Sequence, residues 1–253
     1  MEDSIIVENL SKSFRLYHEK SKSVFDLVRT AINKNPYEML QVLNDVSFSV
    51  KKGEMVGIIG RNGIGKTTLL RLIAGIYKPD TGKITINGKL VPFLAIGSGF
   101  HPELTAISNV KLYGTLLGIS RNEIKNKVDE IIEFAELEKF ADSKLKHFSA
   151  GMSARLAFST AIHVEPDILL MDEIISVGDL SFQQKSYDAC MALKNKGKSI
   201  ILVTHSMQPV REFCDQSILL NKGKIEYIGN TEEAVSQYEK MSTENKINDF
   251  ENI

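Results

Sequence analysis

The sequence predicts an α/β protein whose core is a mostly parallel β-sheet. Three short apolar runs have the length and composition of buried strands. They are Met55–Ile59, Asp167–Met171 and Lys198–Thr204. Helical patterns separate these runs along the chain, as expected when crossover helices join parallel strands. From about 97 to 160 the segments expected to be regular are helical, which predicts an inserted helical subdomain.

Composition places the chain among ordinary globular proteins. Its 253 residues are 43% hydrophobic and 25% charged, enough for a full core. The net charge of −1 gives no general case for nucleic acid, so no nucleic-acid partner is predicted. Cys190 and Cys214 lack metal-ligand spacing, which favours reduced thiols in the cytosol. No apolar run approaches a membrane span, and Met1–Ser4 lacks the basic and apolar regions of a signal peptide.

Before the first buried strand, the sequence predicts two further strands, Ser4–Val7 and Val42–Val50. A polar insertion of about 17–41 separates them. Within Ser23–Ile32, apolar residues recur at helical spacing and predict a short amphipathic helix. These residues are Val24, Phe25, Leu27, Val28 and Ile32.

The rest of the chain alternates between the two kinds of element. Lys83–Asn87 and Lys89–Leu94 are predicted to form a hairpin around Asn87-Gly88. The predicted helices are Ala106–Leu117, a helix opened by the capping box Ser120–Glu123 and running to about Leu137, Ser153–His163, Ser181–Lys194 and Thr231–Met241. Two strands, Gln216–Leu220 and Lys224–Ile228, flank a turn. The whole is predicted as one domain of residues 1–241, followed by a polar tail, 242–253.

One stretch fits the pattern G-x-x-x-x-G-K-[ST] between a strand and a helix, which is the context of a phosphate-binding loop. It consists of Gly60, Arg61, Asn62, Gly63, Ile64, Gly65, Lys66, Thr67 and Thr68. Glycines let consecutive backbone N–H groups turn towards a phosphate chain, and the helix N-terminus adds its own donors. Lys66 is predicted to reach the β- and γ-phosphates, Thr67 to ligate Mg²⁺ and Thr68 to contact a phosphate.

Polar residues follow two of the buried strands at the edge where the phosphate loop is expected. Asp172 is predicted to hold Mg²⁺, directly or through water, and Glu173 to orient or deprotonate the attacking water. An Asp-Glu pair after a strand is more often a solvated turn, but a nucleotide needs a metal ligand at such a position. His205 is a candidate contact of the γ-phosphate or the water, although a lone histidine is more often structural.

Taken in order, these motifs resemble those of the ATP-binding subunit of an ABC transporter, over about Ile5 to Tyr238. Besides the phosphate loop, Asp172, Glu173 and His205, the resemblance rests on Phe148-Ser149-Ala150-Gly151-Met152 and Ser176-Val177-Gly178-Asp179. It implies an ATP hydrolase that uses ATP and Mg²⁺. It also implies a head-to-tail pair of subunits, in which Ser149 and Gly151 contact the γ-phosphate of ATP bound to the other copy.

A narrower resemblance is to exporters of O-antigen, teichoic acid and related lipid-linked polysaccharides. It rests on Ile96–Thr105, Phe148–Phe158, Ser176–Gln183 and the long insertion before Val42. It implies a separate polytopic permease and a peripheral location at the cytoplasmic face of the membrane. The sequence departs from the general family at two places. The loop near 95–97 lacks the usual Gln. The stretch Phe148–Met152, which corresponds to the family's signature motif, has Ala150 and Met152 where Gly and Gln are usual.

Two assignments stay open on the sequence alone. Phe14 and Tyr17 are candidates for stacking on adenine, and ordinary packing explains them equally well. The predicted helix 23–32 is expected at the membrane-facing side, next to the permease, where nearby cations would meet anionic head groups or a lipid-linked pyrophosphate. These cations are Lys20, Lys22, Arg29 and Lys34. Packing of this helix on the sheet is the alternative.

Two other classes of ATPase fit the sequence less well than a transport ATPase. ABC ATPases of translation or DNA repair usually have two fused ATPase halves or a long coiled coil, and this sequence shows neither. An unrelated P-loop kinase would not need the signature together with Glu173 and His205. An exporter of a different substrate remains an alternative, because the polymer is indicated by resemblance alone.

Overall fold

The computed structural model describes residues 2–17, 37–94, 99–172 and 179–251; for residue 17 and residues 244–251 it describes the backbone alone. Several predicted features lie outside these ranges. They are the helix 23–32, the loop 95–97, Glu173 and Ser176-Val177-Gly178.

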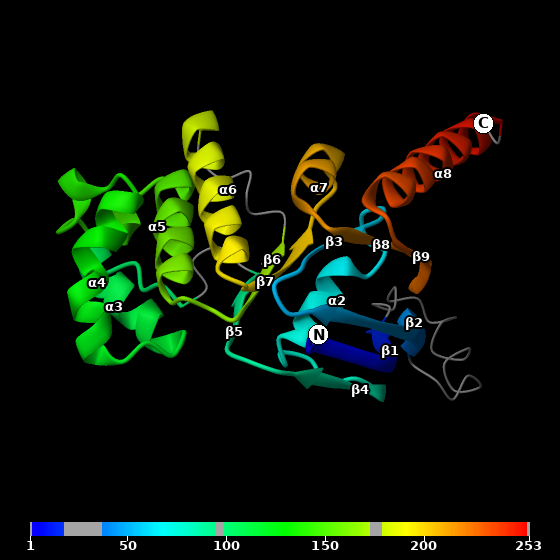
Figure 1. Ribbon diagram of the computed structural model, residues 1–253, viewed down its shortest axis with the longest axis horizontal. Helices are drawn as coiled ribbons and strands as arrows, with labels where there is room; N and C mark the ends of the chain where they lie inside the picture. The colour runs from blue at the N-terminus through cyan, green and yellow to red at the C-terminus, as the bar shows by residue number, and fades with distance from the viewer. Residues whose placement is uncertain (1, 18–36, 95–98, 173–178, 252–253) are drawn as a thin grey trace, which may run out of the picture.

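Two β-sheets form the centre of the molecule (Figure 1). The smaller is antiparallel, with the order β2-β1-β4, and consists of β1 (Asp3–Tyr17), β2 (Tyr37–Lys51) and β4 (Thr81–Ile86). The larger has the order β5-β6-β7-β3-β8-β9, in which neighbours from β5 to β8 are parallel and β9 is antiparallel. Its strands are β3 (Met55–Ile59), β5 (Leu90–Phe93), β6 (Ile168–Asp172), β7 (Ser199–Val203), β8 (Gln216–Asn221) and β9 (Lys224–Gly229). The predicted mostly parallel core is confirmed.

The helices fall into a compact group at one end of the molecule and a set around the larger sheet (Figure 1). The group at the end comprises α3 (Ala106–Leu116), α4 (Arg121–Phe134), two short 3₁₀ turns (Glu138–Phe140 and Leu145–His147) and α5 (Ala150–His163). The others are α2 (Lys66–Ile73), α6 (Leu180–Asn195), α7 (Met207–Phe213) and α8 (Thr231–Glu251). Within the described ranges no helix has the length and apolarity that crossing a membrane requires.

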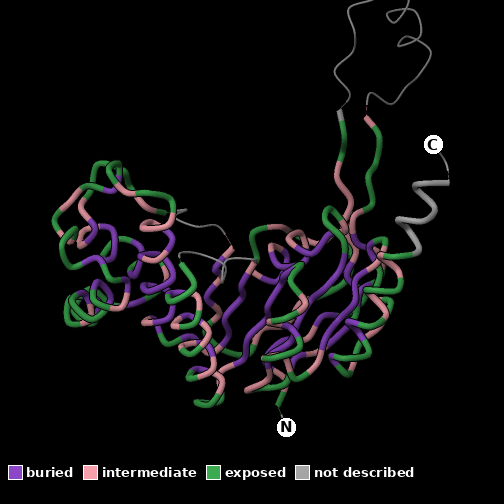
Figure 2. The backbone as a smooth tube through the Cα atoms, turned by 90° about the horizontal axis from the view of Figure 1, so that it is seen from above, coloured by how far each residue is buried: buried purple, intermediate pink, exposed green. Residues whose placement is uncertain are grey.

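Alternate residues of the central strands face two different cores, because side chains alternate across a strand. On β6, Ile168 and Leu170 join the core formed with α2 and the small sheet. Leu169 and Met171 join the core formed with the helices, which includes Phe182 of α6. The central strands are buried on both faces, as the continuous apolar runs predicted (Figure 2).

The predicted hairpin around Asn87-Gly88 is wrong. β4 pairs with β1 in the small sheet, whereas β5 pairs in parallel with β6 in the larger one. The chain therefore crosses between sheets at this turn. Asp167 holds the crossing, since its carboxylate accepts the Lys89 N–H at 2.9 Å and the Lys198 ammonium at 2.8 Å.

Several element boundaries differ from the prediction. β1 and β2 extend as a long hairpin as far as the pair Tyr17 and Tyr37, and Figure 2 shows this arm leaving the body of the protein. The backbones of the two strands remain paired in this arm, but neither face of the arm is buried. Its sequence therefore lacks the alternation of apolar and polar residues from which a strand is predicted. α5 begins at Ala150 rather than Ser153, and α8 continues to Glu251 rather than ending near Met241. The predicted Ser120 cap is confirmed, since its hydroxyl accepts the Glu123 N–H at 3.3 Å.

Candidate functional site

The phosphate loop joins β3 to α2 and takes backbone conformations that require glycine. Gly60, Gly63 and Gly65 have φ angles of 153°, 77° and 112°. A Cβ atom on Gly60 would lie 2.5 Å from the Leu220 carbonyl oxygen, closer than real contacts allow. The loop therefore adopts a path that few other residues could follow.

Positive charge gathers where the loop enters α2. No side chain caps this helix at Gly65 and its first turn holds no acidic residue, in a part of the chain that is fully described. Lys66 is only 6% exposed, and its ammonium donates to the carbonyl oxygens of Gly60 at 2.6 Å and Arg61 at 3.0 Å. Uncapped N–H groups, the positive end of the helix dipole and a buried ammonium fit a chain of phosphates.

A pocket of about 390 Å³ lies beside the first half of the loop. Its remaining walls come from the end of β8, the turn after it and α8, which contributes Tyr238, Met241 and Ser242. Residues 60–64 of the loop are thus open to a hollow rather than covered by the chain. The part of α8 beyond Met241, which the sequence predicts to be a tail, begins at this wall.

The carboxyl ends of β3, β6 and β7 are adjacent because β7 lies between the other two and all three are parallel. This edge brings together the phosphate loop, Asp172 at the end of β6 and His205 just after β7. Thr67 lies in the first turn of α2, which packs against β6. Ligands of α/β sheets bind at such an edge.

The residues at this edge fit a magnesium ion that is shared with a nucleotide. A hydroxyl and a carboxylate are hard oxygen ligands of the kind Mg²⁺ uses, with substrate phosphates completing the shell. Among the described residues there is no group of three or more His, Cys, Asp or Glu side chains that would hold a metal unaided. Thr67 and Asp172 would therefore share the ion with phosphate oxygens.

Ser149 caps the N-terminus of α5, where its hydroxyl oxygen accepts the Met152 N–H at 3.1 Å. Its own hydroxyl proton has no acceptor among the residues that the structure describes. A Cβ atom on Gly151 would meet only the Ser149 hydroxyl, at 3.8 Å, so nothing in the described parts of this chain requires glycine there. α5 lies with the helices at one end of the molecule, away from α2 (Figure 1).

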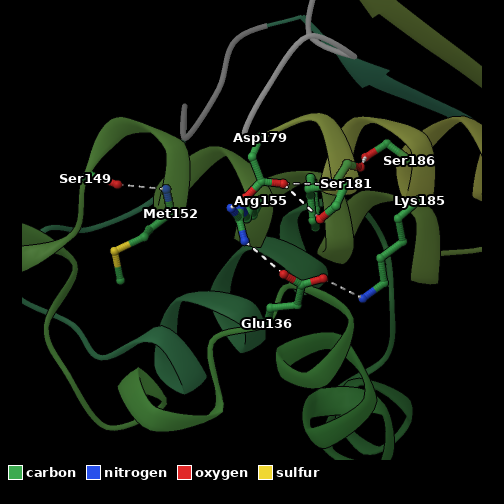
Figure 3. A network of polar contacts seen from close by, with 9 residues as sticks. Glu136, Ser149, Met152, Arg155, Asp179, Ser181, Lys185 and Ser186 are labelled. Atoms are coloured by element: carbon green, nitrogen blue, oxygen red, sulfur yellow. Dashed lines mark hydrogen bonds and ion pairs between the residues drawn. The ribbon is translucent and has the colours of Figure 1, made fainter.

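A network of ion pairs connects α5 to the start of α6 (Figure 3). Arg155 donates to Asp179 at 2.7 Å and to Glu136 at 3.0 Å. Asp179 in turn caps α6 by accepting the Phe182 N–H. That backbone bond, the Ser181 hydroxyl and the Arg155 charge hold the pKa of Asp179 below its usual range. No local sequence pattern indicates a role for Arg155, because its two partners lie far from it along the chain.

The two adenine candidates lie on the last part of β1. Phe14 is half-buried and meets Tyr77 edge-on, with ring centroids 5.5 Å apart, while the Lys12 ammonium lies 5.4 Å from its ring centre. Only the backbone of Tyr17 is described, opposite Tyr37 at the end of the hairpin arm. Stacking of either ring on adenine stays a prediction.

Comparison with known proteins decides the family. The sequence profile described as "ABC transporter" matches residues 43–176, more than half of the chain. The chain belongs to the ABC transporter family. As a member of this family, it is an ATP-binding and ATP-hydrolysing subunit.

Relatives in this family match almost the whole chain. It is 40% identical to the O-antigen export system ATP-binding protein RfbB of Klebsiella pneumoniae, over 95% of this chain and 99% of that protein. It is 38% identical to the teichoic acids export ATP-binding protein TagH of Bacillus anthracis, over 92% of this chain and 42% of that protein. The chain thus spans less than half the length of that second relative.

Solved ABC structures share the fold. An ATP-binding subunit of an ABC transporter superposes with a TM-score of 0.74 and 26% identity, covering 92% of both chains. A dimeric ATP-binding cassette in a post-hydrolysis state, bound to ADP and phosphate, gives a TM-score of 0.72 and 25% identity over 90% of this chain and 98% of that one. The predicted ABC ATPase architecture is confirmed.

Proposed function

We propose that this ABC subunit powers export of a lipid-linked polysaccharide, of the O-antigen or teichoic acid kind, through a separate membrane permease. The observation that carries the proposal is the match to an O-antigen export ATP-binding protein over 99% of that relative's length. The subunit would then sit peripherally at the cytoplasmic face of the membrane, held there by the permease.

In this proposal, the residues at the sheet edge have different roles in ATP hydrolysis. The phosphate loop and Lys66 hold the phosphate chain, while Thr67 and Asp172 hold Mg²⁺. When bound there, the ion would supply positive charge that stabilises the phosphates during hydrolysis. Glu173 positions the attacking water and accepts its proton, and His205 donates a hydrogen bond to the γ-phosphate or orients the water. Catalysis of this kind works chiefly by positioning and by stabilising charge.

Two copies of the chain would complete each site, with Lys66 of one copy and Ser149 of the other on the same nucleotide. Among the described residues, the Ser149 hydroxyl proton has no acceptor and only that hydroxyl lies near a Cβ atom built on Gly151; both features support this pairing, because they suit a phosphate brought by another chain. The related dimeric cassette bound to ADP and phosphate supports it as well. Such a pair has two-fold symmetry.

The test is ATP-dependent dimerisation of the Glu173→Gln variant, measured by light scattering after size exclusion. This variant should bind ATP and scarcely hydrolyse it, so the dimer should accumulate. Adding Lys66→Ala to it should abolish the dimer. If Glu173→Gln stays monomeric with ATP, both alone and with the permease present, the two-copy arrangement is wrong. Failure to copurify with any polytopic membrane protein would count against transport itself.

We propose that the insertion of about 17–41, together with the hairpin arm whose strands it joins, meets the permease. Leu16, Met39 and Leu40 on this arm are 39%, 55% and 45% exposed, which leaves apolar surface beside the insertion. The test is the pair of substitutions Lys22→Glu and Arg29→Glu in the insertion. ATPase activity of the isolated subunit should survive, while polymer export or stimulation by the permease should fall. Normal export with normal stimulation would reject this role, and a subunit that fails to fold would show that the segment packs on the sheet.

A further inference from the structure

Arg155 binds two carboxylates that come from different parts of the chain. One amino group of its guanidinium lies 2.7 Å from Asp179, and the other lies 3.0 Å from Glu136. The same side chain lies over the Phe182 ring, 5.1 Å from the ring centre, and is only 19% exposed. A planar, always charged guanidinium suits this combination of two acceptors and a ring.

These partners lie at the junctions of three helices. Asp179 is the N-cap of α6 and follows the proposed catalytic Glu173 by six positions. Glu136 comes just after α4, in a left-handed conformation with φ of 59°. Arg155 itself lies on α5, the helix that Ser149 caps. One side chain therefore connects the end of the segment after Glu173 to the helix that carries Ser149 (Figure 3).

We propose that Arg155 is a positioning residue that fixes the first turn of α5 relative to the start of α6. In this role it sets the direction in which Ser149 and Gly151 approach the nucleotide held by the second copy. It also makes that direction depend on Asp179, which lies six positions after the proposed catalytic Glu173 in the sequence. The inference rests on the proposed two-copy function and adds a residue that touches neither nucleotide nor metal.

Another cation in the same network, Lys185, provides a matched control for substitutions of Arg155. Lys185 pairs with the other oxygen of Glu136 at 3.3 Å and lies over the Phe134 ring, but it has no contact with Asp179 among the described residues. Lys185→Met therefore removes one charge from the same cluster and leaves the link between Arg155 and Asp179 in place. Arg155→Lys keeps the charge but replaces the fork by a single ammonium, which cannot hold both carboxylates in the same geometry.

The experiment compares Arg155→Lys with Lys185→Met in two backgrounds. In the Glu173→Gln background, Arg155→Lys should raise the ATP concentration for half-dimerisation by about tenfold or more, the effect expected for losing one charge-assisted hydrogen bond. With Glu173 intact, kcat should fall by about the same factor. Affinity of the monomer for a fluorescent ATP analogue should stay within about twofold in both variants, because Arg155 does not touch the phosphate loop. Lys185→Met should leave all three quantities within about twofold.

Amide hydrogen exchange separates positioning from a merely structural role. Arg155→Lys should speed exchange of the Met152 amide, whose hydrogen bond is to Ser149, and of the Phe182 amide, whose bond is to Asp179. Lys185→Met should change neither. Unchanged exchange at both amides, or dimerisation and kcat that match the parent, would overturn the proposal. So would a lower melting temperature with equal losses in nucleotide binding and dimerisation, because that pattern reports global destabilisation.

The two proposals fail in distinguishable ways. If the Glu173→Gln parent never dimerises, the two-copy arrangement is wrong, and the exchange measurement on the single chain still decides whether Arg155 holds α5 and α6 together. If the parent dimerises and Arg155→Lys dimerises equally well, the two-copy arrangement stands and the role of Arg155 falls.

Discussion

At the scale of single residues, Lys66 is buried and its ammonium donates hydrogen bonds to backbone carbonyl oxygens of the phosphate loop. Replacing it by Ala removes the ammonium that faces the phosphates. We expect the dissociation constant for ATP to rise about 10- to 100-fold, the range for a lost charge-assisted hydrogen bond. Isothermal titration calorimetry would measure this. Lys78→Ala, which removes an exposed lysine shortly after α2, is the matched control and should bind ATP normally.

Glu173 and His205 are predicted to act on turnover rather than on binding. Glu173→Gln and His205→Ala should each lower kcat by at least about a hundredfold, as expected when a group acting only in the transition state is lost. ATP affinity should remain within a few-fold of the parent. A steady-state ATPase assay beside a binding titration gives both numbers. Loss of ATP binding with an unchanged circular dichroism spectrum would assign that residue to structure instead.

At the scale of elements, α5 offers a test in which stability and function should move apart. Gly151 lies in the first turn, and a Cβ atom there meets nothing closer than 3.8 Å. Gly151→Ala should therefore leave the melting temperature unchanged or raise it slightly, because Ala favours a helix over Gly. ATP-dependent dimerisation of the Glu173→Gln form should nevertheless weaken, since the methyl group would occupy the approach to the phosphate. Unaltered dimerisation would remove Gly151 from the interface.

Asp167 is expected to stabilise the crossing from β4 to β5, and this contribution to stability should depend on pH. The Lys198 ammonium and then the Lys89 N–H hold the pKa of the Asp167 carboxyl below its usual value of 3.8. A depressed folded-state pKa stabilises the protein above the unfolded-state pKa, and this stabilisation is lost as the pH falls through the folded value. Asp167→Asn should therefore lower the melting temperature at pH 7 and lose less stability on acidification below about pH 5.

Thermal unfolding across that pH range would test this expectation, with Asp142→Asn as the control for an exposed carboxylate outside the crossing. Asp142→Asn should follow the parent at every pH. If Asp167→Asn and the parent lose stability in parallel on acidification, Asp167 does not contribute to the acid sensitivity.

At the scale of the whole molecule, nucleotide and metal should stabilise the fold together. ATP with Mg²⁺ at about a hundred times its dissociation constant adds roughly 2.7 kcal/mol, which corresponds to a rise of about 5–10 °C for a domain of this size. We expect this shift for Glu173→Gln by differential scanning fluorimetry. Chelating Mg²⁺ should reduce the shift, and Thr67→Ala should reduce it similarly. An equal shift with and without Mg²⁺ would exclude Thr67 and Asp172 as its ligands.

Much of the candidate site could be read from the sequence because its signals are local. A strand, a glycine-rich loop and a helix within Met55–Ile73 specify the phosphate loop by themselves. Apolar runs marked β6 and β7 as buried parallel strands, which was enough to predict that Asp172 and His205 share an edge with that loop. The order of these motifs along the chain was then sufficient to predict the family.

Tertiary structure alone decided the features that depend on contacts between distant residues. β5 joins β6 rather than β4, and at this crossing Lys89 bonds to Asp167, which is far away along the chain. Arg155 acquires its role from Asp179 and Glu136, which approach it only when α4, α5 and α6 pack. The periodicity of apolar residues predicts which face of a helix or strand a residue lies on. Which distant residue it contacts depends on the packing and charges of the folded chain, so a short stretch of sequence does not predict that contact.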